Sequence, residues 1–226
     1  MAGIVCPYSR MVDMIDRFLI INLDERKDRL ESIADQCREA GIPEDRMTRI
    51  SAVKEAVGWR GCTKSHIGAL QLAKANRWKT VMVLEDDVDF TQGGGYLKDT
   101  VRECMLNRGA WDVVMMNYGL SCRAPAGTLE ERGRGALRDY FPVTRVTDKF
   151  YRVKGGAATS SCYLITLPYY DTLIANYREG LDLGTPLDLH WETLQRRDRW
   201  LFPAPPVGAQ REDYSDILGR VVNYGF

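Results

Sequence analysis

The stretch Val81-Met82-Val83-Leu84-Glu85-Asp86-Asp87-Val88 joins four apolar residues directly to three consecutive carboxylates. The apolar half shows no polar alternation and carries two valines, which is typical of a short strand buried on both faces. In an open α/β sheet, ligands bind in the crevice beyond the carboxyl ends of such strands. We therefore expect the acidic half to lie where this fold class places its chemistry.

Three neighbouring carboxylates repel one another strongly once they are partly removed from water. At ~5 Å and an effective dielectric constant of ~20, each pair costs roughly 3 kcal/mol, against under ~1 kcal/mol in open water. A cluster at residues 85–87 thus favours a bound cation, and its hard oxygen ligands favour Mg²⁺ or Mn²⁺. The alternative is a solvated turn after the strand.

The composition is that of an ordinary globular chain. Of the 226 residues, 45% are hydrophobic and 27% charged, which predicts one domain with a sizeable core. The 31 basic and 31 acidic side chains cancel, which argues against general binding to nucleic acid or to a membrane surface.

The six cysteines are scattered without a C-x-x-C pair, which argues against a zinc site or a redox dithiol. The first sixteen residues have no continuous apolar core, and no run reaches the ~20 apolar residues of a membrane span. We therefore expect a cytoplasmic, soluble protein with reduced thiols and no transmembrane segment.

The first strand and helix predict the opening unit of a parallel, doubly wound sheet. Residues 18–23 (FLIINL) are the strand, Asp24 is the expected N-cap of the helix, and Gly41 with Pro43 ends it. The polar residues around this turn favour an anion at the helix N-terminus. They are Asn22, Asp24, Arg26 and Arg29, and the alternative for the two arginines is a solvated helix face.

Residues 42–60 are expected to be irregular. Thr63 or Ser65 is the expected cap of the next helix, which runs to about Asn76 and carries His66 in its first turn. His66 is interpreted either as a structural donor or as a substrate contact. Gly93-Gly94-Gly95 is interpreted as a hinge, since no phosphate-loop pattern follows.

Further strands are expected at 111–117 and 161–166, and further helices at 96–107, at 168–178 and after Asp188. Residues 1–16 are expected to form a loose N-terminal arm. The segment 121–156 holds eight Lys and Arg against four Asp and Glu, a net +4, and predicts a long loop that serves as a lid or acceptor site. The alternative is a solvated insertion.

Several stretches, in the same order, resemble the family 25 glycosyltransferases, which include lipopolysaccharide galactosyltransferases and collagen galactosyltransferases. The stretches are 18–29 (FLIINLDxRxxR), 61–66 (GCxxSH) and 78–88 (W…VLEDDV), with weaker matches at Trp111-Asp112, Pro186-Leu187-Asp188, Gln210 and Ser215-Asp216-Ile217. They span residues 18–217. The segment 121–156 matches nothing in the family, so the resemblance does not identify the acceptor.

The resemblance implies an α/β fold of the GT-A type, with a Rossmann-like, mostly parallel central sheet flanked by helices, in one catalytic domain over residues 1–226. It also implies a nucleotide-sugar donor, commonly UDP-galactose, and Mn²⁺ or Mg²⁺ held by a DxD-like element. Asp87 and Glu85 would bind the metal, and Glu85 and Asp86 would contact the ribose or the metal. The nucleotide end would be lined by Asn22, Asp24, Arg26, Arg29, Ser65 and His66.

The implied reaction moves a hexose, galactose or glucose, to a hydroxyl of a glycan or glycoprotein, with inversion at the anomeric carbon. The acceptor hydroxyl then needs a carboxylate within hydrogen-bond reach to take its proton. Asp188 is the candidate, with Asp216 and Asp213 behind it, and the alternative for Asp188 is a plain helix N-cap.

Two other functions are consistent with the sequence. Asp87-Val88-Asp89-Phe90-Thr91 spells the D-x-D-x-T nucleophile motif of haloacid-dehalogenase-like phosphatases, although Glu85 and Asp86 stand where that motif has strand residues. A non-catalytic protein that binds nucleotide sugars is the other alternative, and the intact Glu85-Asp86-Asp87 cluster argues against it.

Overall fold

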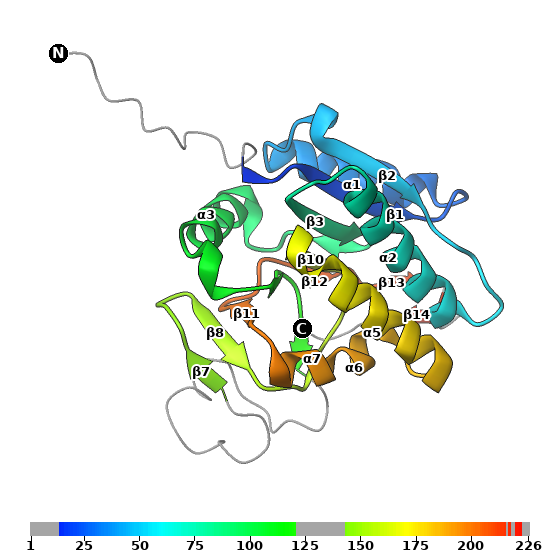
Figure 1. Ribbon diagram of the computed structural model, residues 1–226. Helices are drawn as coiled ribbons and strands as arrows, with labels where there is room; N and C mark the ends of the chain where they lie inside the picture. The colour runs from blue at the N-terminus through cyan, green and yellow to red at the C-terminus, as the bar shows by residue number, and fades with distance from the viewer. Residues whose placement is uncertain (1–13, 121–142, 216, 218–219, 223–226) are drawn as a thin grey trace.

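The computed structural model describes residues 14–120, 143–215, 217 and 220–222. Its centre is an eight-stranded sheet in the order β2-β1-β3-β10-β5-β11-β8-β7 (Figure 1). These strands are β1 (Arg17–Asn22), β2 (Met47–Ser51), β3 (Thr80–Glu85), β5 (Val113–Met115), β7 (Val143–Arg145), β8 (Phe150–Val153), β10 (Cys162–Thr166) and β11 (Trp200–Pro203). All run in one direction except β8 and β10, as the pairings require.

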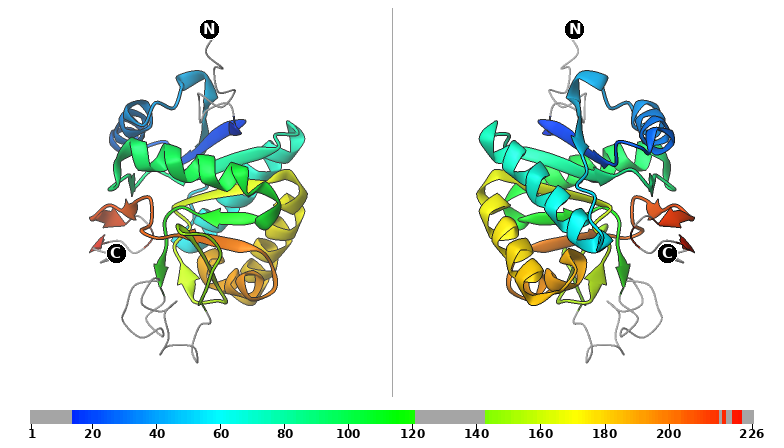
Figure 2. Two further views of the ribbon diagram at one scale, coloured as in Figure 1. Left: turned by 90° about the vertical axis from the view of Figure 1, so that its left-hand side faces the viewer. Right: turned by 90° about the vertical axis from the view of Figure 1, so that its right-hand side faces the viewer.

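Helices cover both faces of this sheet, as the two side views in Figure 2 show. They are α1 (Lys27–Glu39), α2 (Gly58–Ala75), α3 (Gly93–Leu106), α5 (Tyr170–Leu183), α6 (Leu187–His190) and α7 (Glu192–Arg197), with 3-10 turns at Glu44–Arg46, Arg108–Ala110 and Leu167–Tyr169. The observed fold is therefore the predicted α/β class, a Rossmann-like, mostly parallel sheet between helices, as expected for the GT-A type.

The central strand β3 is buried on both faces, as its unbroken apolar run predicted. Val81 and Val83 belong to the core on the side of α2 and α5, whereas Met82 and Leu84 belong to the core on the side of α1 and α3. All four side chains are 0% exposed. This burial fixes the register of β3 and carries Glu85 to the end of the strand.

The order of the first three strands creates the crevice. The chain runs from β1 through α1 to β2 on one side, then through α2 to β3 on the other side of β1, and both neighbours are parallel to β1. The strand order therefore switches direction at β1 and β3, and ligands of open α/β sheets bind outside the strand ends at such a point. Those ends are Asn22 and Glu85.

Two predicted helix caps are wrong. The N-cap of α1 is Arg26, not Asp24, and the N-cap of α2 is Val57, not Thr63 or Ser65. Asp24 instead accepts hydrogen bonds from Arg49 and Ser51. The hydroxyl of Ser65 donates to the carbonyl of Gly61 four residues earlier, 2.8 Å away, which hydroxyl side chains do within helices. His66 consequently lies in the middle of α2.

Two irregular segments of the prediction are regular in the structure. Residues 47–51, expected to be irregular, form the edge strand β2, whose side chains are partly or fully exposed and therefore lack a strand signal. The three glycines expected to be a hinge begin α3. A Cβ on Gly94 would lie 2.6 Å from the Cα of Ala40, so glycine is needed for the close packing of α3 against the end of α1.

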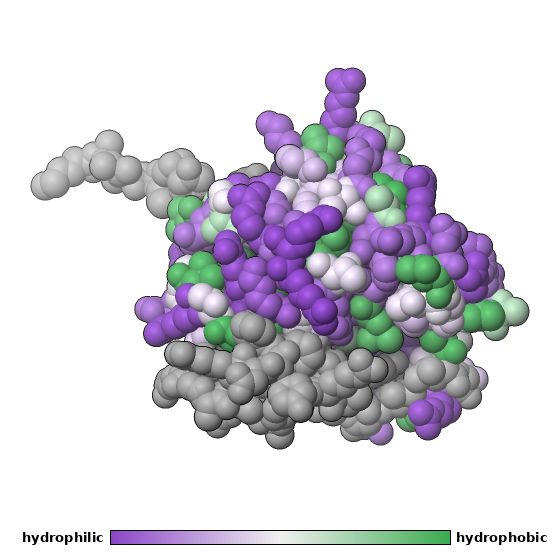
Figure 3. Space-filling model, turned by 60° about the horizontal axis from the view of Figure 1, so that its bottom comes forward, coloured by the Kyte–Doolittle hydropathy of each residue, from purple (hydrophilic) through white to green (hydrophobic). Residues whose placement is uncertain are grey.

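The segment 121–156 is described only from residue 143 onward. Strands β7 and β8 extend the main sheet at one edge, and β6 (Gly119–Leu120) pairs with β9 (Ala157–Ala158) across the segment. Residues 121–142 of the expected lid and residues 1–13 of the expected arm lie outside the described residues. None of the helices in the described ranges has the length and apolar character needed to cross a membrane. On the face shown in Figure 3, apolar residues are scattered among hydrophilic ones over the described surface.

Candidate functional site

A cleft opens at the carboxyl ends of β1 and β3 and encloses ≈ 870 Å³ of empty space, including its open mouth. Its lining residues come from both strands and the turns after them, from α1 and α2, from the loop after β2 and from the C-terminal segment. They are Ile21, Leu23, Arg29, Ala52, Val53, Lys54, Glu55, Gly58, Cys62, Ser65, Glu85, Asp86, Asp87, Gln210, Ser215 and Ile217. The acidic cluster thus lies in the crevice that its sequence position predicted.

Asp86 is held by Asn22 and Arg29, two residues that were predicted to line the nucleotide end of the site. Asn22 Nδ2 donates to Asp86 Oδ2 at 2.7 Å, and Arg29 Nη1 donates to Asp86 Oδ1 at 3.3 Å. Burial raises the pKa of Asp86, and the hydrogen bond from Asn22 and the charge of Arg29 act against that rise. Both Asp86 oxygens are therefore engaged within the protein.

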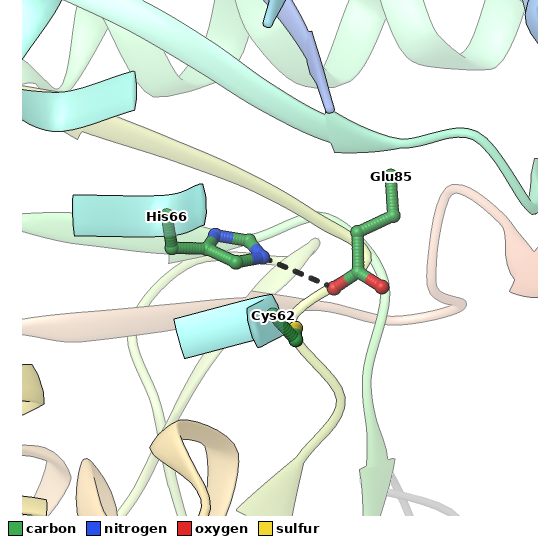
Figure 4. Close-up of side chains that lie close together, drawn as sticks. All are labelled: Cys62, His66 and Glu85. Atoms are coloured by element: carbon green, nitrogen blue, oxygen red, sulfur yellow. Dashed lines mark hydrogen bonds and ion pairs between the residues drawn. The ribbon is translucent and has the colours of Figure 1, made fainter. Parts of the chain in front are cut away.

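Glu85 is anchored from the opposite side. His66 Nε2 lies 3.2 Å from Glu85 Oε1, and Ser160 Oγ donates to the same oxygen at 2.5 Å. Burial raises the pKa of Glu85, but the His66 and Ser160 contacts outweigh burial and bring the pKa below its usual value. The second carboxylate oxygen points away from His66 (Figure 4).

Asp87 is the member of the cluster whose charge is least compensated. Its side chain is 15% exposed, and Oδ1 has no hydrogen-bond partner among the described residues. Gln210 Nε2 donates to Oδ2 over a long 3.4 Å, and the Arg29 guanidinium lies 3.9 Å from the same oxygen. Burial, Glu85 and Asp86 together raise the pKa of Asp87 to about 7.

This arrangement fits a divalent cation. An unpartnered buried carboxylate oxygen carries a large desolvation cost, which a bound cation would offset. Asp87 would be a ligand, and Glu85 could add its outward oxygen. Asp87 and Glu85 both offer carboxylate oxygens, which suit Mg²⁺ or Mn²⁺.

The raised pKa of Asp87 predicts that the metal-free protein is less stable at pH 8 than at pH 5. In the native state the carboxyl holds its proton up to about pH 7, whereas its ordinary value is 3.8. The native state therefore binds more protons between pH 4 and 7, so stability falls as pH rises through this window and levels off above it, by at most ~4 kcal/mol. Raised pKa values at Asp86 and Asp188 act in the same direction.

Denaturant unfolding at pH 5 and pH 8 measures this effect. Asp87→Asn removes the titrating group, so the difference between the two pH values should shrink in the variant. Equal pH dependence in the variant and the parent would contradict the assignment.

The other predicted site residues fall into two groups. Ser65 lines the cleft and accepts the N–H of Val53 at 2.8 Å, whereas His66 is fully buried behind Glu85. Asp24 and Arg26 do not line the cleft, and Arg26 pairs with the exposed Asp28. Nucleotide contacts by these last two residues stay a prediction.

Asp188 does not line the cleft, but it lies close enough to the anchored Glu85 for the two charges to interact. It belongs to the first turn of α6, whose N-cap is Pro186, so its expected alternative as the helix cap is wrong. Its Oδ2 accepts the N–H of Thr159 at 3.3 Å, and Ser160, the next residue, holds Glu85. Burial raises the pKa of Asp188, and the negative charge of Glu85 adds to the rise.

The backbone at Thr159 is strained. Its φ is +83°, a conformation that is rare for a β-branched residue, and the neighbouring Gly155 and Gly156 also have positive φ. The N–H bond to Asp188 helps to hold this conformation. The side chain of Asp213 and all of Asp216, the other two candidate bases, lie outside the described residues.

Several lining residues were not predicted as site residues. Lys54 and Glu55 enter from the loop after β2, and Cys62 comes from α2. Cys62 and His66 are four residues apart, a spacing that places both on one helix face and could have indicated a shared site. No sequence signal marks Ser160, which reaches Glu85 because β10 pairs antiparallel with β3.

The structure places the two aspartates of the phosphatase motif in different surroundings. Asp87 lies in the cleft, whereas Asp89 is exposed in β4 (Val88–Asp89) and does not line the cleft. Strand β4 pairs with β12 (Ala209–Gln210), which brings Gln210 to Asp87.

Comparison with known proteins gives similarity at the level of the fold. No family model and no curated protein matches the sequence. Among solved structures, A197 from STIV matches with 15% identity and a TM-score of 0.44, over 82% of this chain and 79% of that one. Mannose-1-phosphate geranyltransferase from Thermus thermophilus matches with 10% identity and a TM-score of 0.43, over 86% and 73%.

A third structure is 4-diphosphocytidyl-2C-methyl-D-erythritol synthase from Anaerococcus prevotii. It has 12% identity and a TM-score of 0.46, and the match covers 92% of this chain and 95% of that one. At these identities the likeness concerns the fold alone.

Proposed function

We propose that the protein is a metal-dependent glycosyltransferase that moves a hexose from a nucleoside-diphosphate sugar to a hydroxyl of a glycan or glycoprotein, with inversion. The observation that carries this proposal is the Asp87 carboxylate in the cleft at the end of β3, whose buried Oδ1 has no partner among the described residues. A divalent cation held there by Asp87 and Glu85 would stabilise the charge that develops on the leaving diphosphate.

The cleft wall offers further attraction for a diphosphate. Helix α2 spans 18 residues and begins at Gly58, a lining residue, without a side-chain cap. The N-terminal N–H groups and the helix dipole therefore favour an anion in the cleft. Arg29 lines the same cleft and adds a fixed positive charge next to Asp86 and Asp87.

The three acids of the cluster take different roles in this proposal. Asn22 and Arg29 hold Asp86 in place, so Asp86 supports the geometry of the cleft and would contact the ribose there. His66 and Ser160 fix one oxygen of Glu85 and leave the other for the cation or the ribose. Asp87 is the principal ligand because no side chain neutralises it as closely.

Asp188 is the proposed general base. A carboxylate with a raised pKa is a stronger base than an ordinary one, and at neutral pH it still accepts a proton from the acceptor hydroxyl. Burial and Glu85 supply that rise, and the Thr159 N–H orients the carboxylate. A single displacement assisted by such a base inverts the anomeric carbon.

A thermal-shift screen of nucleotide sugars with and without Mn²⁺ tests the proposal. Binding at 100 times Kd adds ~2.7 kcal/mol of stability, which raises the Tm of a chain of this size by roughly 5–10 °C. We expect a UDP-hexose to give this rise only when Mn²⁺ is present. A donor that shifts the Tm equally with chelator present, or no shift for any nucleotide sugar, would count against the proposal.

A further inference from the structure

A second set of metal-ligating side chains lies behind the acidic cluster. Each of three residues offers one ligand atom: Cys62 its Sγ, His66 a ring nitrogen and Glu85 a carboxylate oxygen. These three atoms all lie within 4.8 Å of one another. Figure 4 shows the three side chains gathered at one place, two from α2 and one from the end of β3. Glycosyl transfer as proposed above uses Glu85 and its contact with His66 but gives no role to the thiol.

We propose that Cys62, His66 and Glu85 form a binding site for Zn²⁺, next to the oxygen-ligand position at Asp87, with Glu85 shared between the two positions. The cysteine spacing argued against zinc because the sequence has no C-x-x-C pair. The structure supplies a mixed set instead, in which a helix places a thiol and an imidazole four residues apart opposite a strand-end carboxylate.

One of the three ligand pairs already has the spacing of a tetrahedral site. Ligands at ~2.1 Å from a zinc ion lie ~3.4 Å apart along a tetrahedron edge. His66 Nε2 and Glu85 Oε1 are 3.2 Å apart. A small shift of Cys62 toward this pair completes three protein ligands, and because Cys62 and Glu85 both line the cleft, water can occupy the fourth position.

The surroundings hold the ligands as a zinc site requires. His66 Nδ1 lies 3.0 Å from the hydroxyl of Tyr163, an outer partner that fixes the ring and leaves Nε2 for a metal. That hydroxyl is in turn 3.5 Å from the hydroxyl of Tyr177. Ser160 touches both Cys62 and Glu85, so it ties the two ligands together.

The chemistry of the set selects zinc over manganese. A thiolate and an imidazole are soft or borderline ligands that favour Zn²⁺, whereas Mn²⁺ favours the oxygens at Asp87. Burial, followed by the nearby Glu85 and Asp188, raises the pKa of the Cys62 thiol. The metal-free thiol is therefore protonated, and zinc must displace that proton on binding.

Cobalt substitution followed by zinc competition tests this site on the protein alone, without any activity measurement. The parent for the test carries Cys6→Ser and Cys122→Ser, which removes the two thiols outside the described residues. We expect one equivalent of Co²⁺ to give a thiolate-to-cobalt charge-transfer band and tetrahedral d–d bands, both of which zinc abolishes. Cys62→Ser should lose the charge-transfer band and bind zinc ~100-fold more weakly.

Three further variants complete the test. Tyr163→Phe keeps all three ligands but removes the outer partner, so zinc affinity should fall ~10-fold with the band retained. Cys104→Ser, a buried thiol in the opposite core, should change nothing. Asp87→Asn should retain the band, which separates this site from the proposed manganese position. A parent without the charge-transfer band, or a band that survives in Cys62→Ser, would overturn the proposal whatever the fate of the transferase activity.

Discussion

Replacing Asp87 with asparagine is expected to abolish manganese-dependent binding of the nucleotide-sugar donor. The variant keeps the size of the side chain but removes the charge that no neighbouring group compensates closely. Loss of an outer partner alone weakens a metal site ~10–100-fold, so loss of the principal ligand should weaken donor binding at least ~100-fold. Calorimetric titration of UDP with and without Mn²⁺ measures the effect directly.

Asp89→Asn is the matched control for this experiment. Asp89 lies two residues further along, is exposed in β4 and does not line the cleft, so the variant should bind like the parent. Unchanged manganese-dependent binding in Asp87→Asn would remove Asp87 from the metal site. Hydrolysis of an aryl phosphate that both substitutions abolish would instead favour the phosphatase alternative.

The sequence predicts the centre of this fold well because burial there leaves a strong signal. Strand β3 is apolar without alternation, and its residues pack against helices on both faces. Strand β1 and helix α1 carry equally clear patterns, and Gly41 ends α1 with the expected left-handed φ of +72°. The crevice between the ends of β1 and β3 follows from these elements together.

The edges of the fold are less predictable because their side chains lie partly against the core and partly in solvent. Strand β2 exposes much of its surface, so its side chains show no apolar pattern, yet backbone pairing with β1 holds it in place. The antiparallel direction of β10 has no local signal either. Its strand residues are apolar, as in the parallel strands, and the direction depends on how the chain crosses the sheet.

The contacts within the site also divide into those that the sequence indicates and those that depend on the arrangement of the chain. The sequence placed Asn22 and Arg29 at the end of one strand and the start of the next helix, but their contacts with Asp86 come from the structure. The contact of His66 with Glu85 depends on where α2 begins, and that start was displaced by the misassigned cap. Ser160 arrives through β10, so its contact could not be derived without the sheet order.

Asp188→Asn is expected to slow glycosyl transfer ~100-fold or more while leaving donor affinity near that of the parent. The amide can still accept the Thr159 N–H, so the strained turn and the end of β9 should stay in place. It cannot accept the proton of the acceptor hydroxyl, which is the loss expected for a missing general base. The effect should appear in kcat with little change in the KM of the donor.

The exposed Asp182, at the end of α5, provides the control, because Asp182→Asn changes the same charge away from the cleft and should leave kcat unaltered. The pH dependence of kcat distinguishes a general base from a residue that only positions other groups. Because the pKa of Asp188 is raised, the kcat of the parent should begin to fall, as the pH is lowered, at a higher pH than an ordinary aspartate would give. This acidic limb of the pH profile should be absent from the residual activity of Asp188→Asn. A variant that keeps full kcat, or keeps the same acidic limb, would assign the proton transfer to another group.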